Sequence, residues 1–276
     1  MSRLTWEQAV LSLRSDPQRQ ALVRDAYYDD PVLDAARRFA DSEEFAATLS
    51  LLGQWLPGVA LEIGAGRGIA SYAFARVGSK IYALEPDPSP IVGRGAIEEL
   101  AAVQSGIIPL AGTAEQIPLP DSSVDVVYGR AVFHHAADLA RLGQEVGRVL
   151  RPGGVALFAR EHVIRGPREL PAFLARHPLH HLYGGEAAYQ VREYKQALEG
   201  GGLDVVRAFG PFESVINYYP ASPEALWPGR LGLIRRSAAR VPYLAQGLDR
   251  LRSLLDRTPG RHYTFLAVRR NQATAA

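Results

Sequence analysis

The sequence predicts an α/β fold built on a mostly parallel sheet, and three observations support this class. Short apolar runs at 59–63, 80–84, 107–110 and 124–128 alternate with segments of helical apolar spacing. Glycine and proline turns separate these runs, as expected for strands that are joined by crossover helices. A glycine-rich turn directly follows the first run. Together these features predict a Rossmann-like domain.

The composition fits one large α/β domain with a sizeable insertion. The chain has 276 residues, of which 47% are hydrophobic, enough to bury a core. Its formal net charge of +2 is too small to indicate nucleic-acid binding by itself. The absence of cysteine excludes disulfides, zinc–thiolate sites and cysteine nucleophiles. Because we find neither a signal-peptide core at the start nor an apolar run long enough to span a bilayer, we expect a soluble, cytoplasmic protein.

The rest of the chain is organised around the turn that contains Gly64, Gly66 and Gly68. Glycines have no Cβ, so backbone N–H groups in this turn can approach a ligand closely, and positive φ angles are tolerated. The third glycine comes one residue earlier than in the dinucleotide pattern Gly-x-Gly-x-x-Gly. This spacing, together with Glu62, argues against a Rossmann oxidoreductase, an alternative that NADH titration would test.

Two acidic residues indicate what the turn binds. Glu62 stands just before it, and a carboxylate there suits a cationic ligand better than a pyrophosphate. Glu85 lies at the tip of the second run, 21 residues after Gly64, where an acid can accept both hydroxyls of a ribose. The residues therefore predict a site for a nucleoside with a positively charged tail.

Five segments in order resemble motifs of class I S-adenosylmethionine (SAM)-dependent methyltransferases, in particular the type 11 group that is similar to ubiquinone and menaquinone biosynthesis enzymes. Their residues are 61–68, 84–87, 112–121, 124–128, and His134-His135 with 145–154. Five motifs in the family's order make the resemblance specific. It implies a seven-stranded sheet with an antiparallel last strand, SAM as methyl donor and S-adenosylhomocysteine as product.

The resemblance places the cofactor at the ends of the first four strands. At the position of Thr113 the family commonly has an acid, which accepts a hydrogen bond from the adenine amino group. The Thr113 hydroxyl can accept this hydrogen bond more weakly than a carboxylate, and Glu115 can take over part of the acid's role. The methionine part of SAM is expected near the end of the fourth strand. The predicted cofactor-binding residues are Glu62, Gly64, Ala65, Gly66, Glu85, Pro86, Thr113, Ala114, Glu115, Gly129 and Arg130.

Polar residues that follow the fourth and fifth strands are the catalytic candidates: His134, His135, Glu161 and His162. A histidine at this edge can deprotonate a hydroxyl while a methyl group is transferred, or it can be a structural hydrogen-bonder. Glu161 and His162 offer a second base or a contact to a substrate hydroxyl. The four residues have chemistry that suits a divalent metal, but no ligand spacing enforces a site, and we predict no metal.

Segments outside the motifs are expected to cover the substrate. Helices are predicted at 3–14, 17–28 and 32–53, then at 88–104, 139–150 and 186–198, with later strands at 155–158, 203–209 and 262–268. The candidate substrate contacts are Tyr27, Tyr28, His180, His181, Tyr183, Tyr218 and Tyr219. Each has an ordinary alternative as a packing aromatic or a solvated surface residue. The predicted insertion at 211–260 contains an arginine-rich stretch with apolar residues at helical spacing. We expect its arginines to lie in solvent and its apolar face to be packed against the protein. Alternatively, the stretch could rest on a membrane surface or bind an acidic substrate.

The sequence therefore predicts four parts. They are an N-terminal helical lid (1–53), a SAM-binding core (54–210, with a substrate loop at 164–185), a helical cap (211–260) and a last strand with its tail (261–276). The predicted activity is methyl transfer to a small molecule, first to a hydroxyl of a secondary metabolite, sugar or lipid-linked compound.

Several alternatives to this activity stay open. They are carbon or nitrogen methylation, and a protein that binds SAM without transferring a methyl group. Nucleic-acid or protein substrates are disfavoured, since no Asn-Pro-Pro-aromatic motif follows the fourth strand. The oligomeric state is expected to be a monomer or a homodimer.

Overall fold

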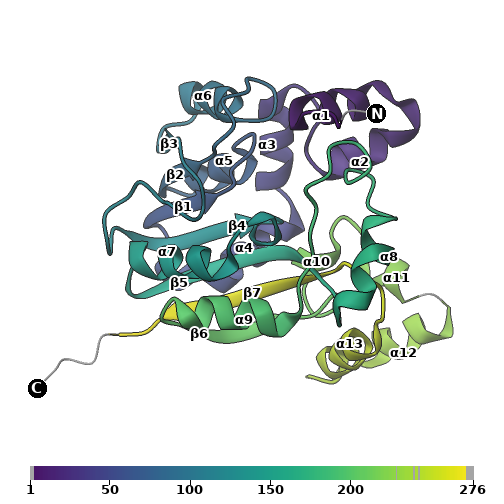
Figure 1. Cartoon of the computed structure of the whole chain (residues 1–276). Coiled ribbons are helices and arrows are strands. Elements are labelled where there is room, and N and C mark those ends of the chain that lie inside the picture. Colours follow the sequence, from purple (N-terminus) through teal and green to yellow (C-terminus); the bar gives the residue numbers. More distant parts are fainter. Residues whose placement is uncertain (1–2, 228, 239, 242, 272–276) are drawn as a thin grey trace, which may run out of the picture.

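One seven-stranded sheet forms the centre of the computed structural model, which describes residues 3–227, 229–238, 240–241 and 243–271 (Figure 1). The strand order is β3-β2-β1-β4-β5-β7-β6. β7 runs antiparallel to β5 and β6, and the other neighbouring strands are parallel. This confirms the predicted sheet. The strands are β1 (Val59–Ile63), β2 (Lys80–Leu84), β3 (Ile107–Leu110), β4 (Val124–Arg130), β5 (Leu150–Val163), β6 (Leu203–Phe209) and β7 (Arg261–Arg269).

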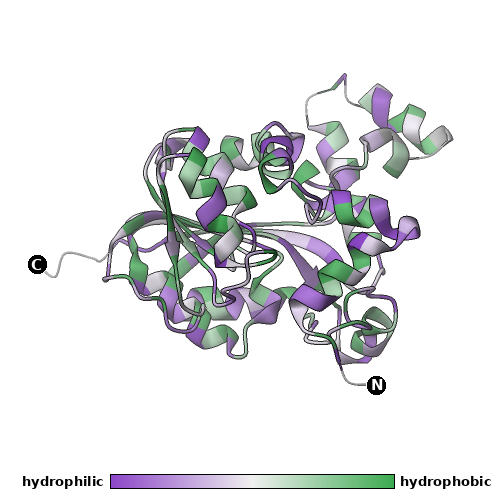
Figure 2. Ribbon diagram, turned by 90° about the horizontal axis from the view of Figure 1, so that it is seen from above, coloured by the Kyte–Doolittle hydropathy of each residue, from purple (hydrophilic) through white to green (hydrophobic). Residues whose placement is uncertain are grey.

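Helices cover both faces of this sheet (Figures 1 and 2). Alternate residues of a strand point to opposite faces, so Ala60 packs towards α3–α6 while Leu61 packs towards α7 and α9. The helices are α1 (Trp6–Ser15), α2 (Gln20–Asp25), α3 (Val32–Ala40), α4 (Glu43–Leu52), α5 (Ile69–Arg76), α6 (Arg94–Val103), α7 (Leu139–Val149), α8 (Leu170–Leu174), α9 (Val191–Gly200), α10 (Val215–Tyr218), α11 (Pro223–Leu226), α12 (Arg230–Ala238) and α13 (Leu244–Leu255).

The predicted bounds hold for β1, β2, β3 and β6, but β5 is longer than expected. It begins at Leu150 and continues to Val163, with an irregular register against β7 between Phe158 and Glu161. The extension arises because β7 pairs with residues 161–163 as well as with the earlier part of the strand. Glu161 and His162 therefore lie within β5, although the prediction placed them beyond its end.

Several predicted helices are shorter or divided. The helix expected at 32–53 is two helices, because Ser42 accepts a hydrogen bond from the Phe45 N–H and caps a new start. The helix expected at 17–28 ends as an α-helix at Asp25. Residues 88–93 precede α6, and residues 186–190 precede α9 with only an isolated bridge from Tyr189 to β5. Glu186 consequently lies in an irregular segment, outside helices and strands.

The arginine-rich helices α12 and α13 do not bury the apolar face that the prediction gave them. The two helices contact each other at one end of the sheet (Figures 1 and 2). Large apolar side chains on them are nonetheless exposed, namely Leu231, Leu233, Ile234, Leu244, Leu251, Leu254 and Leu255. The expectation of a packed apolar face is therefore wrong for these residues. Within the described residues, no helix has the length and apolar character needed to cross a membrane.

The N-terminal helices and the segment after α8 meet over the carboxyl ends of the parallel strands (Figure 1). The Leu4 N–H donates to the Leu182 carbonyl at 3.1 Å. Trp6 packs edge-on against Tyr183, with 4.8 Å between ring centroids. Leu13, Val23 and Leu179 form the buried centre of this contact. These segments therefore form one packed layer above the edge that carries the predicted site.

Candidate functional site

The glycine turn after β1 is built from three left-handed residues. The φ angles of Gly64, Gly66 and Gly68 are 62°, 53° and 77°, which only glycine adopts at low cost. A Cβ on Gly64 would lie 2.2 Å from Val132 Cγ2, so this turn packs directly against the turn after β4. A Cβ on Gly66 would meet no atom closer than 3.9 Å. Gly66 therefore leaves open space in which a ligand can approach the backbone.

Glu85, at the end of β2, is tied to the glycine turn. Its carboxylate accepts hydrogen bonds from the N–H groups of Gly66 at 2.8 Å and Asp87 at 2.9 Å. Burial raises the pKa of Glu85, against the effect of these two backbone hydrogen bonds. The side chain is thus fixed beside the open space at Gly66, as a ribose-binding acid requires.

Glu62 is a buried acid beneath the same turn. Burial raises its pKa to about 8, although the hydrogen bond from the Ser71 hydroxyl lowers it. The side chain is 4% exposed. A cationic ligand group near Glu62 would favour its ionised form, which burial alone disfavours.

The remaining predicted cofactor residues surround these acids. The Ala65 N–H donates to the Leu84 carbonyl, and the Pro86 carbonyl accepts from Arg94 at 2.7 Å. Thr113 forms an isolated bridge with Gln116, which places Ala114 in a tight turn. Glu115 accepts a hydrogen bond from the Ala137 N–H at 2.8 Å. One of its oxygens is therefore engaged with the start of the segment before α7.

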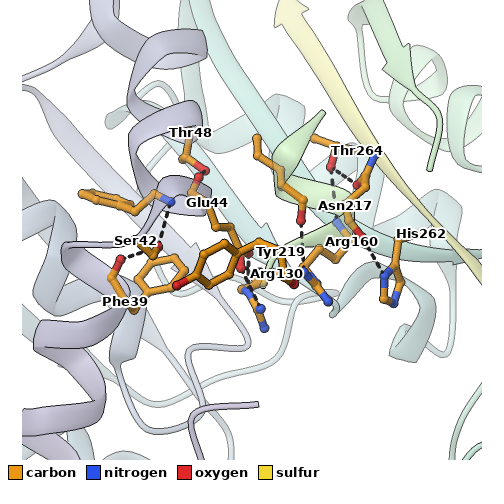
Figure 3. Close-up of polar contacts among 12 residues, drawn as sticks. Phe39, Ser42, Glu44, Thr48, Arg130, Arg160, Asn217, Tyr219, His262 and Thr264 are labelled. Carbon is orange, nitrogen blue, oxygen red and sulfur yellow. Dashed lines mark hydrogen bonds and ion pairs between the residues drawn. The ribbon is translucent and has the colours of Figure 1, made fainter. Parts of the chain in front are cut away.

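Arg130 makes a contact that the sequence did not predict. Its guanidinium binds both carboxylate oxygens of Glu44 on α4, at 2.7 and 3.0 Å (Figure 3). Glu44 is completely buried, and Arg160 of β5 approaches it at 3.8 Å. The guanidinium of Arg130 also lies 5.5 Å from the centre of the Tyr27 ring. This pair joins the end of β4 to the N-terminal helices, and the predicted contact of Arg130 and Gly129 with the methionine part of SAM stays a prediction.

The turn after β4, which contains the 3-10 helix Phe133–His135, is held by Glu161. The completely buried carboxylate accepts hydrogen bonds from the N–H groups of Val132, Phe133 and His134, each at 3.1 Å. It also lies 2.7 Å from His134 Nδ1. Both oxygens of Glu161 are therefore occupied, and the side chain positions His134.

The predicted histidines differ in their protonation. Burial lowers the pKa of His134, but the neighbouring carboxylates of Glu161 and Glu186 outweigh it and raise the pKa to about 9. Burial lowers the pKa of His162 to about 3, and the charge on His134 adds to this effect. At neutral pH His134 is therefore a charged imidazolium, whereas His162 is a neutral imidazole. His135 lies at the surface, with Nδ1 3.3 Å from the Gly185 carbonyl.

Glu186, His177 and His262 join this group, although sequence reasoning did not single them out as site residues. Glu186 accepts a hydrogen bond from the Tyr183 hydroxyl at 2.8 Å and lies 3.6 Å from His134 Nε2. Although burial acts in the opposite direction, its histidine and tyrosine neighbours lower the pKa of Glu186 to about 2. The sequence signal for Glu186 was its place directly after a segment rich in histidine, tyrosine and glycine. For His262 the available signal was its place at the start of the predicted last strand, which the resemblance made antiparallel.

The predicted substrate contacts are divided between packing and the edge of the site. Tyr27 is buried against Phe39, while Tyr28 packs edge-on against Trp6. His181 Nε2 lies 2.9 Å from the Ala175 carbonyl, at the surface. The carbonyl of Tyr219 accepts a hydrogen bond from Arg160 (Figure 3). Tyr218 lies in α10, and His180 Nδ1 is buried without a hydrogen-bond partner in the part of the chain that the structure describes.

A surface recess at the other end of the sheet is separate from this arrangement. It has a volume of about 880 Å³ and is lined by Trp55, Gly153 and Val268, among others. These residues adjoin the starts of β1 and β5. The predicted site residues lie at the opposite ends of these strands, so we assign the recess no role.

The strand order and the glycine turn define the class I methyltransferase fold, and comparisons with known proteins agree. Residues 61–158 match a family described as a methyltransferase domain. The solved structure of the cyclase SpnF aligns with a TM-score of 0.55 at 15% identity, covering 83% of this chain and 81% of that one. A geranyl diphosphate methyltransferase, in complex with GPP and sinefungin, aligns with a TM-score of 0.53 at 18% identity, covering 82% and 78%. At such identities these structures support the fold alone.

Curated relatives match about half of the chain. An uncharacterised methyltransferase of Mycobacterium sp. (strain JLS) is 32% identical over 146 residues, covering 53% of this chain and 51% of that protein. The chain thus spans about half the length of the curated relatives it matches. Residues 61–158 therefore resemble the methyltransferase domain of these proteins, over about half of the length of each curated relative.

The residues present fit SAM as the cofactor that this family implies. The open space at Gly66 admits a ligand to the backbone, and the fixed carboxylate of Glu85 is placed for a ribose. The buried acid Glu62 suits a positively charged group. Glu62, Gly66 and Glu85 are the residues that would hold SAM most directly.

Proposed function

We propose that this chain transfers a methyl group from SAM to a small-molecule acceptor, with oxygen as the first choice of acceptor atom. One observation carries the proposal. The turn that holds Gly64 packs against Val132 in the turn that holds His134 and His135. A cofactor bound at the first turn would therefore meet an acceptor bound at the second.

Bound SAM supplies an electrophilic methyl group on its sulfonium, and the chain's own residues do the rest. Glu85 holds the ribose, while Thr113 and Ala114 border the adenine. Glu62 and the turn after β4 enclose the methionine part. Because positioning of the two reactants accounts for most of the acceleration in such a displacement, these contacts matter for rate as well as for affinity.

An acceptor hydroxyl must lose its proton as the new bond forms, and the histidine-rich edge is where this chain can manage that proton. His162 is unprotonated at neutral pH, as its lowered pKa indicates. His134 is held by Glu161 and carries a proton. We therefore assign His162 and His135 the contact with the acceptor, and we assign Glu161 and His134 the task of fixing that edge.

The acceptor is proposed to be small because the edge is covered. The layer formed by α1, α2 and residues 176–190 lies over it, with Trp6 and Tyr183 in contact. Tyr28, His180 and His181 belong to this layer or adjoin it. An extended nucleic acid or protein would have to displace the whole layer. A secondary metabolite, sugar or lipid-linked compound would need only a local opening.

Calorimetric titration with SAM and S-adenosylhomocysteine tests the cofactor half of the proposal. Wild-type protein, shown to be free of co-purified cofactor, should bind both ligands. Glu85→Ala should weaken each by at least about tenfold, because each loses a charged hydrogen-bond acceptor. Glu98→Ala, an exposed acid on α6, is the matched control and should bind as wild type does. If neither ligand binds, the cofactor site is wrong.

Product analysis tests the transfer itself. The protein is incubated with SAM labelled in the methyl group and with panels of phenols, sugars and lipid-linked alcohols. The labelled product is then assigned to oxygen, carbon or nitrogen by NMR. A protein that binds SAM but yields no labelled product from any panel would favour the alternative in which the cofactor is bound without methyl transfer.

A further inference from the structure

All seven histidines of the chain occur near one end of the sheet. They come from the turn after β4, from β5, from the segment after α8 and from the start of β7. Five of them form a connected group of rings, called here the histidine cluster: His134, His135, His162, His177 and His262. His162 is central, with ring centroids 4.6 Å from His134, 5.2 Å from His177 and 5.1 Å from His262.

His134, His162 and Glu186 each bring one possible metal-ligand atom to the same place in this cluster. One ring nitrogen each of His134 and His162 and a carboxylate oxygen of Glu186 all lie within 4.8 Å of one another. The distance from His134 Nε2 to Glu186 Oε2 is 3.6 Å. Ligands of a tetrahedral zinc ion lie about 3.4 Å apart, since each is about 2.0–2.1 Å from the metal. Closing the set around an ion therefore requires movements of about 1 Å at most.

Each of the three side chains has its other polar atom held by a different partner. His134 Nδ1 lies 2.7 Å from Glu161, and His162 Nδ1 lies 3.0 Å from the Gly260 carbonyl. The Tyr183 hydroxyl donates to Glu186 Oε1 at 2.8 Å, which leaves Oε2 towards His134. Such outer partners orient metal ligands and fix the histidine tautomers in metalloproteins. The orientation of each ligand is thus supported from a separate element of the fold.

A fourth nitrogen lies next to this set. His177 Nδ1 is buried, has no hydrogen-bond partner among the described residues, and lies 3.7 Å from Glu186 Oε1. Buried polar atoms without a partner are uncommon in folded proteins. Its position beside Glu186 makes this nitrogen a candidate for a further ligand to an ion between His134, His162 and Glu186.

We propose that His134, His162 and Glu186 bind one divalent first-row transition-metal ion, zinc or a related ion, with His177 as an additional ligand. Two imidazoles and one carboxylate suit such ions, whereas magnesium and calcium prefer sites made of oxygen. Binding of the ion would displace the extra proton that His134 carries at neutral pH, since an imidazole binds a metal only in its neutral form. This differs from the sequence-based expectation of no metal, because Glu186 and His177 were not recognised as neighbours of the two histidines.

The ion would also deepen the assignment of the acceptor, a step that rests on the proposed function. Zinc and related ions can also take a fifth ligand, so a coordination position remains for an acceptor oxygen at the edge where methyl transfer is proposed, and His162 would then contact the acceptor through the ion. An oxygen bound there is polarised and gives up its proton more readily. The preferred acceptor would then carry a hydroxyl, or two adjacent oxygens, that can bind the metal.

Metal titration of untagged, metal-free protein tests the site without any assay of activity. Cobalt is the probe, since its visible absorption reports the coordination, and zinc is then used to displace it. We expect one ion per chain, with no binding of magnesium at similar concentrations. Elemental analysis of the purified protein before stripping gives the ion that it carries.

Variants decide whether these residues bind the ion. Glu186→Gln and His162→Asn should each weaken cobalt binding more than about 100-fold, since loss of even an outer hydrogen-bond partner costs about 10- to 100-fold. Tyr183→Phe keeps all three ligands and should cost about tenfold, which covers the case in which a ligand variant fails to fold. His181→Asn, a surface histidine outside the set, should bind cobalt as wild type does.

Two results would overturn the metal site: no stoichiometric binding, or equal binding by wild type and by both ligand variants. SAM titration of the same samples keeps this result separate from the proposed function. Metal-free protein that still binds SAM leaves the cofactor site intact whichever way the metal experiment falls.

Discussion

The turn after β1 and the turn after β4 meet at the edge of the sheet, and each accepts support from a carboxylate of the neighbouring strand. The two carboxylates differ in how many further hydrogen bonds they can accept. Glu85 at the end of β2 accepts the Gly66 N–H of the turn after β1 and the Asp87 N–H of its own loop, and it adjoins open space at Gly66. Glu161 in β5 accepts three N–H groups of the turn after β4 and also contacts His134. The first acid can still bind a ligand, while the second is fully used in positioning a histidine.

The site has two halves: the glycine half, around the turn after β1 with Glu62 and Glu85, and the histidine half, around the turn after β4 with Glu161 and Glu186. The halves also differ in how burial changes the pKa values of their acids. In the glycine half, burial dominates and raises the pKa values of Glu62 and Glu85. In the histidine half, cationic neighbours outweigh burial and lower the pKa of Glu186 to about 2. A cationic ligand group would therefore favour the ionised forms of the acids in the glycine half. The histidine half already provides its own positive charge.

The largest expected effect is the pH dependence of the free energy of unfolding that the raised pKa of Glu62 causes. Glu62 has a pKa of about 8 when folded and 4.5 as its ordinary value, so between these values the native state holds the proton more tightly than the unfolded state. Its contribution to stability should fall as pH rises from 4.5 to 8, by at most about 5 kcal/mol. Urea unfolding at several pH values should show this fall as a difference between wild type and Glu62→Gln. A constant difference across the range would contradict it.

The next effect concerns the two turn-holding acids. Glu161→Gln should lower the free energy of unfolding by about 3 kcal/mol, because a buried carboxylate with several hydrogen bonds is replaced by an amide whose N–H groups face donors. Glu85→Gln should cost less, about 1–2 kcal/mol in the absence of ligand, since its amide NH2 faces a single backbone N–H and burial already favours the neutral acid at that position. Urea unfolding of the pair measures both. Equal losses would remove the distinction between the two acids.

A third effect separates packing from ligand space within the glycine turn. Gly64→Ala should cost about 2–4 kcal/mol, from the left-handed backbone and the overlap with Val132. Gly66→Ala shares the backbone strain but lacks the overlap, so it should cost only about 1–2 kcal/mol while weakening SAM binding. Thermal unfolding and SAM titration of the two variants make the comparison. In a Val132→Ala background, Gly64→Ala should lower the free energy of unfolding by less than it does in wild type, because the overlap with Val132 Cγ2 is removed.

The glycine half could be predicted from sequence because its determinants are local. The apolar run, the glycines and Glu85 lie within about one strand–helix–strand unit, and the bounds of β1 and β2 were predicted correctly. The histidine cluster could be predicted only in part. His134 and His162 stand at ends of strands, but Glu186, His177 and His262 reach them through the fold of a segment without regular periodicity and through antiparallel pairing with β5. No spacing in the sequence records such contacts.

The smallest expected effect tests whether the covering layer is joined to the histidine half. Tyr183 packs on Trp6 and donates its hydroxyl to Glu186, so it links the N-terminal helices to the cluster. Tyr183→Phe keeps the ring contact and removes one hydrogen bond to a charged acceptor, which should lower the free energy of unfolding by about 1–2 kcal/mol. Tyr189→Phe is the matched control, with an expected change below about 0.5 kcal/mol. If the two variants unfold alike, the Tyr183 hydroxyl does not help to hold the layer on the cluster, and the cluster would keep its geometry when the layer opens to admit an acceptor.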